Sequence, residues 1–259
     1  MSHFKISPHI SLLIVQIAPL PLLLLAWEWA VSGDPQKAFF FGAPSQIFSY
    51  LFSGIVDGSL LFDIYITTLE TVLGFVIGNL IGISFGLGLW ASKRVFEVVK
   101  PYIIALGSAP VFALAPVLII WFGTGLASKV AIATISTVFV ALLQAYRGAQ
   151  QVDDRQIRLL QSFGATKSQI FKKIIVPSSM VWVISAFKLN IGFALLGAFI
   201  GEYISSERGL GHLILVAGGL YNVSLLFVGV FLLIMIALGL DALVGAIELP
   251  LRKWIVRIL

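Results

Sequence analysis

Three charged residues lie inside long apolar stretches and are the side chains best suited to chemistry: Glu70, Lys188 and Asp241. A charge at membrane depth is costly, so it usually pairs with an opposite charge or faces a wet cavity or a substrate. At 1.5 Å per residue, Lys188 lies about 16 Å along a helix from Pro177, and Asp241 lies about as far from Arg252. These matched depths predict a Lys188–Asp241 ion pair. A wet cavity facing Lys188, or an anionic substrate bound to it, stays open as an alternative.

The missing residue types exclude several other chemistries. The sequence has no cysteine, which removes disulfides, thiolate catalysis and cysteine–zinc sites. The three histidines, His3, His9 and His212, lack metal-ligand spacing, and neither an HExxH motif nor a GxxxxGK[ST] phosphate-binding loop occurs. We therefore expect a chain that is not an enzyme, binds no metal or cofactor itself and cannot hydrolyse ATP in the usual way.

The composition indicates a chain embedded in lipid. Of its 259 residues, 59% are hydrophobic and 11% are charged, whereas a soluble domain has about 25% charged residues. The apolar runs that are long enough to cross a bilayer cover residues 10–31, 67–90, 102–122, 127–146, 177–200 and 225–249. The predicted fold is an all-α polytopic membrane protein with about six transmembrane helices in one domain, 1–259. We expect the first span to be retained rather than cleaved as a signal peptide, and a short interfacial helix near 41–54.

The basic residues predict how these spans are oriented. With the N-terminus inside, 13 of the 17 Lys and Arg residues fall in inner segments, 3 fall in outer ones (Lys37, Lys129 and Arg208), and Lys188 lies within a span. Both termini and the loop 147–177, between the fourth and fifth spans, are thus predicted to be cytoplasmic. Glu70 then lies about 35 Å from Lys93 along its helix, near the outer interface, where its side chain can reach water.

Residues 153–177 form the longest charged segment and predict two short helices joined at a glycine, which we call the elbow. Asp153 and Thr166 are capping residues, with Gln169 completing a capping box, and Gly164 suits a left-handed turn between the helices. The predicted apolar stripes are Ile157, Leu160 and Phe163 in the first helix and Ile170, Phe171, Ile174 and Ile175 in the second. An amphipathic elbow that opens at Pro177 into a span suits a part pushed by a partner, although a hairpin lying on the membrane has the same pattern.

The spacing from Gly164 onward resembles the cytoplasmic EAA loop of ABC importer permeases. In that family the loop forms a coupling helix that sits in a groove of the ATPase subunit, so the resemblance implies ATPase coupling here. The motif usually begins with Glu-Ala-Ala, where this sequence has Arg158, Leu159 and Leu160. The implied coupling residues are Gly164, Ala165, Ile170, Phe171, Ile174 and Pro177.

Two further segments extend the resemblance. PVFALAPVLIIWFGTG resembles the nitrate/sulfonate/taurine branch of these permeases. Its Pro110 and Pro116 leave backbone groups without helical partners, which is tolerated only against protein or a water-filled cavity. This span is therefore a candidate pathway wall, and a plain kink is the alternative. Glu202 with Gly209 and Gly211 resembles the family's E…GLG segment between the last two spans. We interpret it as a candidate outer gate, and a simple interfacial loop is the alternative.

Glycine recurs at every fourth position of the second span, at Gly74, Gly78, Gly82 and Gly86. Such a stripe lets two helix backbones approach closely in lipid. Packing within the chain and an interface with a second copy both fit the pattern. The surrounding TTLETVLGFVIG is similar to the second-helix signature of the same family, with Glu70 where a basic residue is expected.

Over about residues 67–249 the chain therefore resembles the permease of an ATP-driven importer of the bacterial inner membrane. The resemblance implies a second permease copy, two ATPase subunits that hold ATP and Mg, and an extracytoplasmic binding protein, without nucleic acid. A small anionic solute of the sulfonate, taurine or nitrate type is expected, with a pyrimidine vitamin precursor or an aromatic carboxylate as alternatives. An ion-coupled secondary transporter stays open, although no internal repeat is visible and only Asp241 fits a midplane carboxylate.

Overall fold

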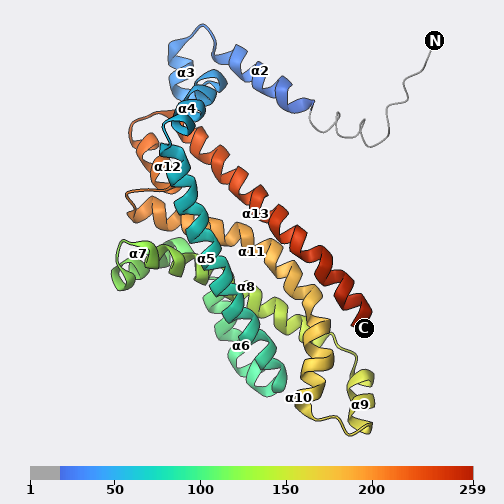
Figure 1. Cartoon of the computed structure of the whole chain (residues 1–259). Coiled ribbons are helices and arrows are strands. Elements are labelled where there is room, and N and C mark those ends of the chain that lie inside the picture. Colours follow the sequence, from blue (N-terminus) through green and yellow to red (C-terminus); the bar gives the residue numbers. More distant parts are fainter. Residues whose placement is uncertain (1–17, 259) are drawn as a thin grey trace, which may run out of the picture. The chain divides into compact units, whose positions relative to one another are not determined.

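The computed structural model describes residues 18–258, with side chains through Glu248 and at Pro250. Every regular element in that range is helical, which confirms the predicted all-α fold (Figure 1). In chain order the helices are α2 (Pro19–Val31), α3 (Pro35–Phe41), α4 (Pro44–Val56), α5 (Ser59–Gly88), α6 (Lys93–Gly107), α7 (Val111–Phe122), α8 (Leu126–Gln150), α9 (Asp154–Ser162), α10 (Lys167–Ile170), α11 (Val176–Ser205), α12 (Leu210–Gly219) and α13 (Val223–Ile258). A 3₁₀ turn, Leu89–Ala91, follows α5, and a π-helical turn, Phe171–Ile175, joins α10 to α11.

The chain forms two compact units. Unit 1 combines the described residues before Phe62 with Ile214–Val230, and unit 2 combines Phe62–Leu213 with the residues from Phe231 onward. Among the described residues, four helical segments are long and apolar enough to cross a membrane. They match the second, fourth, fifth and sixth predicted spans: Ser59–Ala91, Leu126–Gln150, Lys167–Ser205 and Val223–Glu248. Of the first predicted span, residues 10–17 lie outside the described residues, and the remainder contains α2. The short helix predicted near 41–54 is α4.

The third predicted span, 102–122, is not one helix. It breaks into α6 and α7, which meet at a bend of 90°. Pro110 explains the break, because proline lacks an N–H and disfavours helical backbone in the residue before it. Pro110 precedes α7 with extended backbone, whereas Pro116 stays within the helix. Pro110 therefore marks a sharp change of direction, whereas Pro116 does not interrupt α7.

The bent pair nevertheless runs along the whole of α8. Near the start of α6, Phe96 stacks on Tyr146 at the C-terminal end of α8, with ring centroids 3.5 Å apart. In α7, Leu118 packs in one cluster with Ile132, near the N-terminal end of α8, and with Ile200 of α11. The pair thus runs from one end of α8 to the other, as a single broken span would.

The glycine stripe of α5 packs within the chain. Gly74, Gly78, Gly82 and Gly86 face Ala133, Thr137, Ala141 and Ala145 of α8, in that order. A Cβ added to Gly86 would lie 2.9 Å from the Cβ of Ala145, closer than real Cβ atoms come. On another side of α8, a Cβ on Gly197 of α11 would lie 2.6 Å from the Cα of Ala133. α8 is therefore held between glycine faces of α5 and α11.

Buried amides cross-link the same three helices. The Asn190 side chain of α11 donates to Asn79 Oδ1 of α5 at 2.8 Å and to the Thr137 carbonyl of α8 at 3.2 Å. The Asn79 amide donates in turn to the Phe75 carbonyl at 2.7 Å. In an apolar surrounding such bonds fix the register of the helices, because unpaired polar groups are costly there.

Replacing Gly78 by leucine should sharply lower the yield of folded protein, because the added side chain must push α5 away from Thr137. Overpacking of this kind costs about 1–3 kcal/mol or more. Gly88→Leu on the same helix is the matched control, since nothing lies within 4 Å of a Cβ at Gly88. Monodisperse yield after detergent extraction is the measurement, and equal yields for the two variants would contradict the close approach.

Candidate functional site

The N-terminal caps of both elbow helices form as the sequence predicts. The Asp153 carboxylate accepts a first-turn N–H at 2.8 Å. Thr166 and Gln169 form the reciprocal capping box, with the Thr166 N–H 2.8 Å from Gln169 Oε1. Gly164 has a φ of +78°, the left-handed conformation expected of it. Both helical parts of the elbow are thus fixed by local hydrogen bonds.

The second part of the elbow is continuous with the following span. α10, the π-helical turn and α11 make one helical path, Lys167–Ser205. The turn falls just before Pro177, whose ring would clash with the carbonyl of Lys173, four residues earlier, in a regular α-helix. The wider turn accommodates the proline. α10 is therefore joined to α11 without a break in the helical path.

The implied coupling residues mostly face inward. Ile170 and Pro177 are buried, and Ala165, Phe171 and Ile174 pack against one apolar cluster. The buried members of this cluster are Leu87, Ala145, Ala149, Val152, Ile170, Ile175 and Val183. The Phe171 ring also lies 5.8 Å from the ring of Trp90, which follows α5. Apart from the exposed Gly164, these residues attach the elbow to the ends of α5, α8 and α11.

The outward surface of α9 was not predicted correctly. Ile157 and Leu160 pack against the apolar cluster, but Phe163 is 78% exposed and does not continue their stripe. Steps of three residues drift about 60° around a helix, so Phe163 has rotated away from the inner face. Leu159 is also exposed, at 57%. The i, i+4 spacing of Leu159 and Phe163 was the sequence signal that could have placed them together.

At the other end of α11, Glu202 ties the start of α12 to α5. Its buried carboxylate accepts the Thr67 hydroxyl at 2.6 Å and the Gly211 N–H at 2.7 Å. Gly209 has a φ of +102°, and a Cβ there would overlap the carboxyl group of Glu202. The E…GLG pattern therefore reflects a close approach of backbone to carboxylate. We call Glu202, Thr67, Gly209 and Gly211 the Glu202 latch; all four residues are buried.

Glu70 belongs to the same region and does not reach water at the interface. It is buried and interacts electrostatically with Glu202 and with Lys129. Lys129, counted as an outer-loop residue from the sequence, is also buried, and its ammonium donates to the Thr124 carbonyl. Since these contacts join three helices, spacing along one helix could not reveal them.

Lys188 pairs with Glu248, so the predicted partner Asp241 is wrong. The Lys188 Nζ lies 2.7 Å from Glu248 Oε2, with the two side chains 48% and 9% exposed. Asp241 and Glu248 are two helical turns apart on one face of α13, a difference of about 10 Å in depth. The sequence estimate counted residues from Pro177 and from Arg252, and equal counts give equal depths only when two helices have the same tilt.

Removing one partner of the Lys188–Glu248 pair should lower the folded yield, and removing both should restore much of it. A charge in a membrane-embedded segment costs on the order of 3 kcal/mol, and a nearby opposite charge lowers that cost. The variants are Lys188→Met, Glu248→Leu and the double variant, with Asp241→Leu as the control for losing a carboxylate from α13. Extracted yield and melting temperature are the measurements. Purely additive losses, or a loss in the control equal to that of Glu248→Leu, would contradict the pair.

Gly164→Val should weaken the elbow, because a β-branched residue strongly disfavours a φ of +78°. Asparagine tolerates this region, so Gly164→Asn is the matched control. Nothing lies within 4 Å of a Cβ at this position, so any effect comes from the backbone conformation. We expect lower protease resistance of residues 153–177 in the valine variant alone. Identical proteolysis of both variants would contradict the strained turn.

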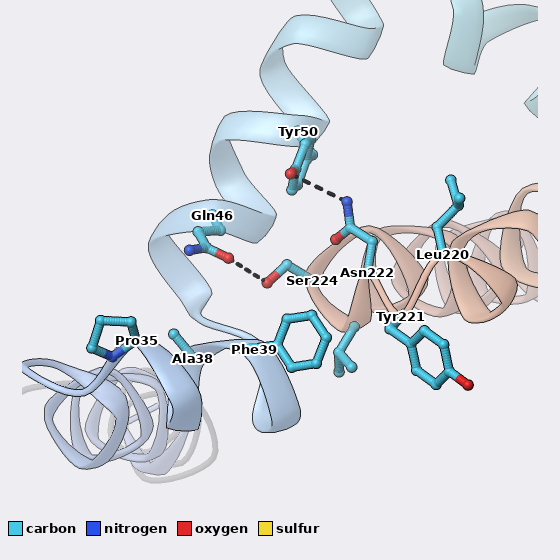
Figure 2. Close-up of a pocket in the computed structure, with 10 residues that line it drawn as sticks. Pro35, Ala38, Phe39, Gln46, Tyr50, Leu220, Tyr221, Asn222 and Ser224 are labelled. Carbon is cyan, nitrogen blue, oxygen red and sulfur yellow. Dashed lines mark hydrogen bonds between the residues drawn. The ribbon is translucent and has the colours of Figure 1, made fainter.

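Unit 1 contains a cavity of about 400 Å³ between α3, α4 and the turn before α13 (Figure 2). On its wall the Asn222 amide donates to the Tyr50 hydroxyl at 3.2 Å, and the Ser224 hydroxyl donates to Gln46 Oε1 at 2.9 Å. None of the residues that line it is charged. Without a positive group, this cavity is not suited to an anionic solute.

Comparison with known proteins relates this architecture to one family. Residues 78–253 match the family described as binding-protein-dependent transport system inner membrane component. The chain is 29% identical to the riboflavin transport system permease protein RibX of Chloroflexus aurantiacus, over 91% of this chain and 88% of that protein. It is 24% identical to the taurine transport system permease protein TauC of Escherichia coli, over 93% and 89%. An inward-facing structure of the MetNI methionine ABC transporter has a similar fold, with a TM-score of 0.69 and 16% identity over 76% of this chain and 97% of that one.

Proposed function

Because the chain belongs to the family of binding-protein-dependent transport system inner membrane components, we propose that it is the membrane-spanning permease of an ATP-driven importer. It forms the path for a small solute delivered by an extracytoplasmic binding protein. The observation that carries this function is the elbow, whose second part is capped by Thr166 and continues without a break into a span. Such a part can pass on movement made by another protein.

The proposed assembly contains two copies of the chain and two ATPase subunits. ATP and Mg bind to the ATPases, and this chain is non-catalytic and binds no cofactor. The location is a bacterial inner membrane with both termini in the cytoplasm. The contact between Trp90 and Phe171 supports this orientation, because it brings the basic start of α6, Lys93 and Arg94, to the same end as the elbow.

In the proposed mechanism α11 acts as a lever. Closure of the two ATPases moves the elbow, and the continuous helix carries that movement towards the Glu202 latch at its far end. Rigid-body shifts of this kind can alternate access to a path between two subunits. Pro110 and Pro116, with Lys188, Asp241 and the latch residues, stay the candidates for its wall or gate.

The solute is proposed to be small and anionic, of the sulfonate, taurine or nitrate type. Similarity to the taurine permease supports this class. A neutral or weakly charged heterocyclic vitamin is the second candidate, since identity to the riboflavin permease is higher, at 29% against 24%. Uptake assays with both classes, each competing against the other, decide between them.

ATP-driven uptake tests the function. The full chain, reconstituted in vesicles with the ATPase and binding protein of its own system, should take up solute only when ATP is present on the elbow side. An ion gradient without ATP should give no uptake, because a permease of this type has no ion coupling.

The second half of the experiment labels single introduced cysteines with an impermeant maleimide. The labelling is specific because the sequence has no cysteine of its own. Ser168→Cys should react from the cytoplasmic side and Glu207→Cys from the outside; gradient-driven uptake or reversed labelling would contradict the proposal.

A further inference from the structure

The cavity in unit 1 is formed by two segments that lie far apart in the sequence (Figure 2). α3 and α4 supply one wall, and the turn between α12 and α13, with the start of α13, supplies the other. Every lining residue belongs to unit 1. At about 400 Å³, the cavity lies at the lower end of the range for small-molecule sites, about 300–1,000 Å³. It is therefore large enough for a small ring compound.

Tyr221, which lines this cavity, has a strained backbone. Its φ is +54°, and no other non-glycine residue in the described part of the chain has a positive φ. Hydrogen bonds from its own N–H to the Gly218 carbonyl and from the next N–H to the Ala217 carbonyl mark the position after a helix end where glycine is usual. Glycine would adopt this conformation without strain. The Tyr221 side chain is 71% exposed, so packing within the chain does little to offset the strain. Its ring is therefore available for contact with another molecule.

Two further exposed aromatic rings line the cavity, Phe39 of α3 and Tyr50 of α4. With Tyr221 they place three flat rings around one space. Aromatic rings bind other rings by offset stacking or by edge-to-face contact. Asp34 and Lys37 adjoin lining residues in the sequence, but neither lines the cavity. The lining thus favours a planar ring without a charge.

The hydrogen-bonding groups left free on the side chains of α4 are donors. Gln46 Oε1 accepts the Ser224 hydroxyl, and the Tyr50 oxygen accepts from the Asn222 amide. The Asn222 oxygen is occupied as well, because it accepts the Leu225 N–H. Among the described residues, none accepts from the Gln46 amide nitrogen or from the Tyr50 hydroxyl. Carbonyl oxygens are the uncharged acceptors that match such donors.

We propose that this cavity binds an uncharged planar heterocycle with ring carbonyl groups, with Tyr221 stacked on its face and Gln46 and Tyr50 donating to its oxygens. The inference concerns this chain alone and does not depend on the proposed function. In the proposed orientation the lining segments lie outside, since they fall between the first and second and between the fifth and sixth predicted spans. A compound outside the cell membrane therefore reaches the cavity without crossing lipid.

Fluorescence titration with lumichrome, an uncharged fused-ring heterocycle with ring carbonyls, tests the inference. The full chain in nanodiscs should bind lumichrome saturably, above the signal of nanodiscs without protein. Tyr221→Gly should weaken binding about tenfold through loss of the stacked ring. The same variant should raise the melting temperature, because glycine relieves the strained turn. A purely structural role of Tyr221 would not give these opposite effects.

Further variants separate the ring from the hydrogen bonds. Gln46→Glu should weaken binding about tenfold, because glutamate keeps an acceptor for Ser224 but has no N–H donors. Tyr221→Phe keeps the ring and should bind lumichrome like wild type. Tyr65→Ala is the matched control, since it removes an exposed ring that does not line the cavity. Absence of saturable binding by wild type, or equal binding by wild type, Tyr221→Gly and Gln46→Glu, overturns the inference.

Competition and a change of surroundings test the class of ligand. An excess of naphthalene sulfonate, a flat ring with a negative charge, should not displace lumichrome, and displacement would refute the preference for an uncharged ligand. Phospholipid is the competing occupant. Binding in detergent but not in nanodiscs would show that lipid covers the cavity, and the inference would fail. Because no ATPase or binding protein is present, none of these results bears on the proposed function.

Discussion

The close approach of α8 to the backbones of α5 and α11 is the constraint on which the rest of unit 2 depends. Lipid supplies little hydrophobic drive for helices to associate, so packing contacts and hydrogen bonds must hold them together. Glycine on α5 and α11 removes the side chains that would separate the axes, and alanine on α8 fills the remaining space. The Asn79–Asn190 bond exists only because the backbones are this close.

The same closeness shapes both ends of α11. At one end the elbow packs on the ends of α5 and α8 through apolar side chains. At the other, Glu202 reaches the backbone of Gly211 and the hydroxyl of Thr67. One is an apolar contact and the other a hydrogen-bonded one, and a continuous helix joins them. In the proposed mechanism, this arrangement is the route by which movement of the elbow reaches the Glu202 latch.

The two faces of the elbow have separate roles. Ile170, Phe171 and Ile174, implied as coupling residues by resemblance, keep the elbow attached to the spans. On the other face, Leu159 and Phe163 are exposed. The residues of one spacing motif therefore include some that pack the elbow against the spans and others that lie exposed on its surface.

The sequence alone determined the helical class, four of the predicted spans, the caps of the elbow and its left-handed glycine, because these depend on local hydrogen bonding and on hydropathy along one segment. It also predicted that the glycine stripe lets another helix approach closely, but not which helix does so. Tertiary structure decided that α8 is that partner, that Lys188 meets Glu248 and not Asp241, that Glu70 is buried beside Glu202, and that Phe163 faces outward. Each of these depends on where two helices cross, and crossing geometry is set by packing of side chains far apart in the chain rather than by the order of residues within either helix.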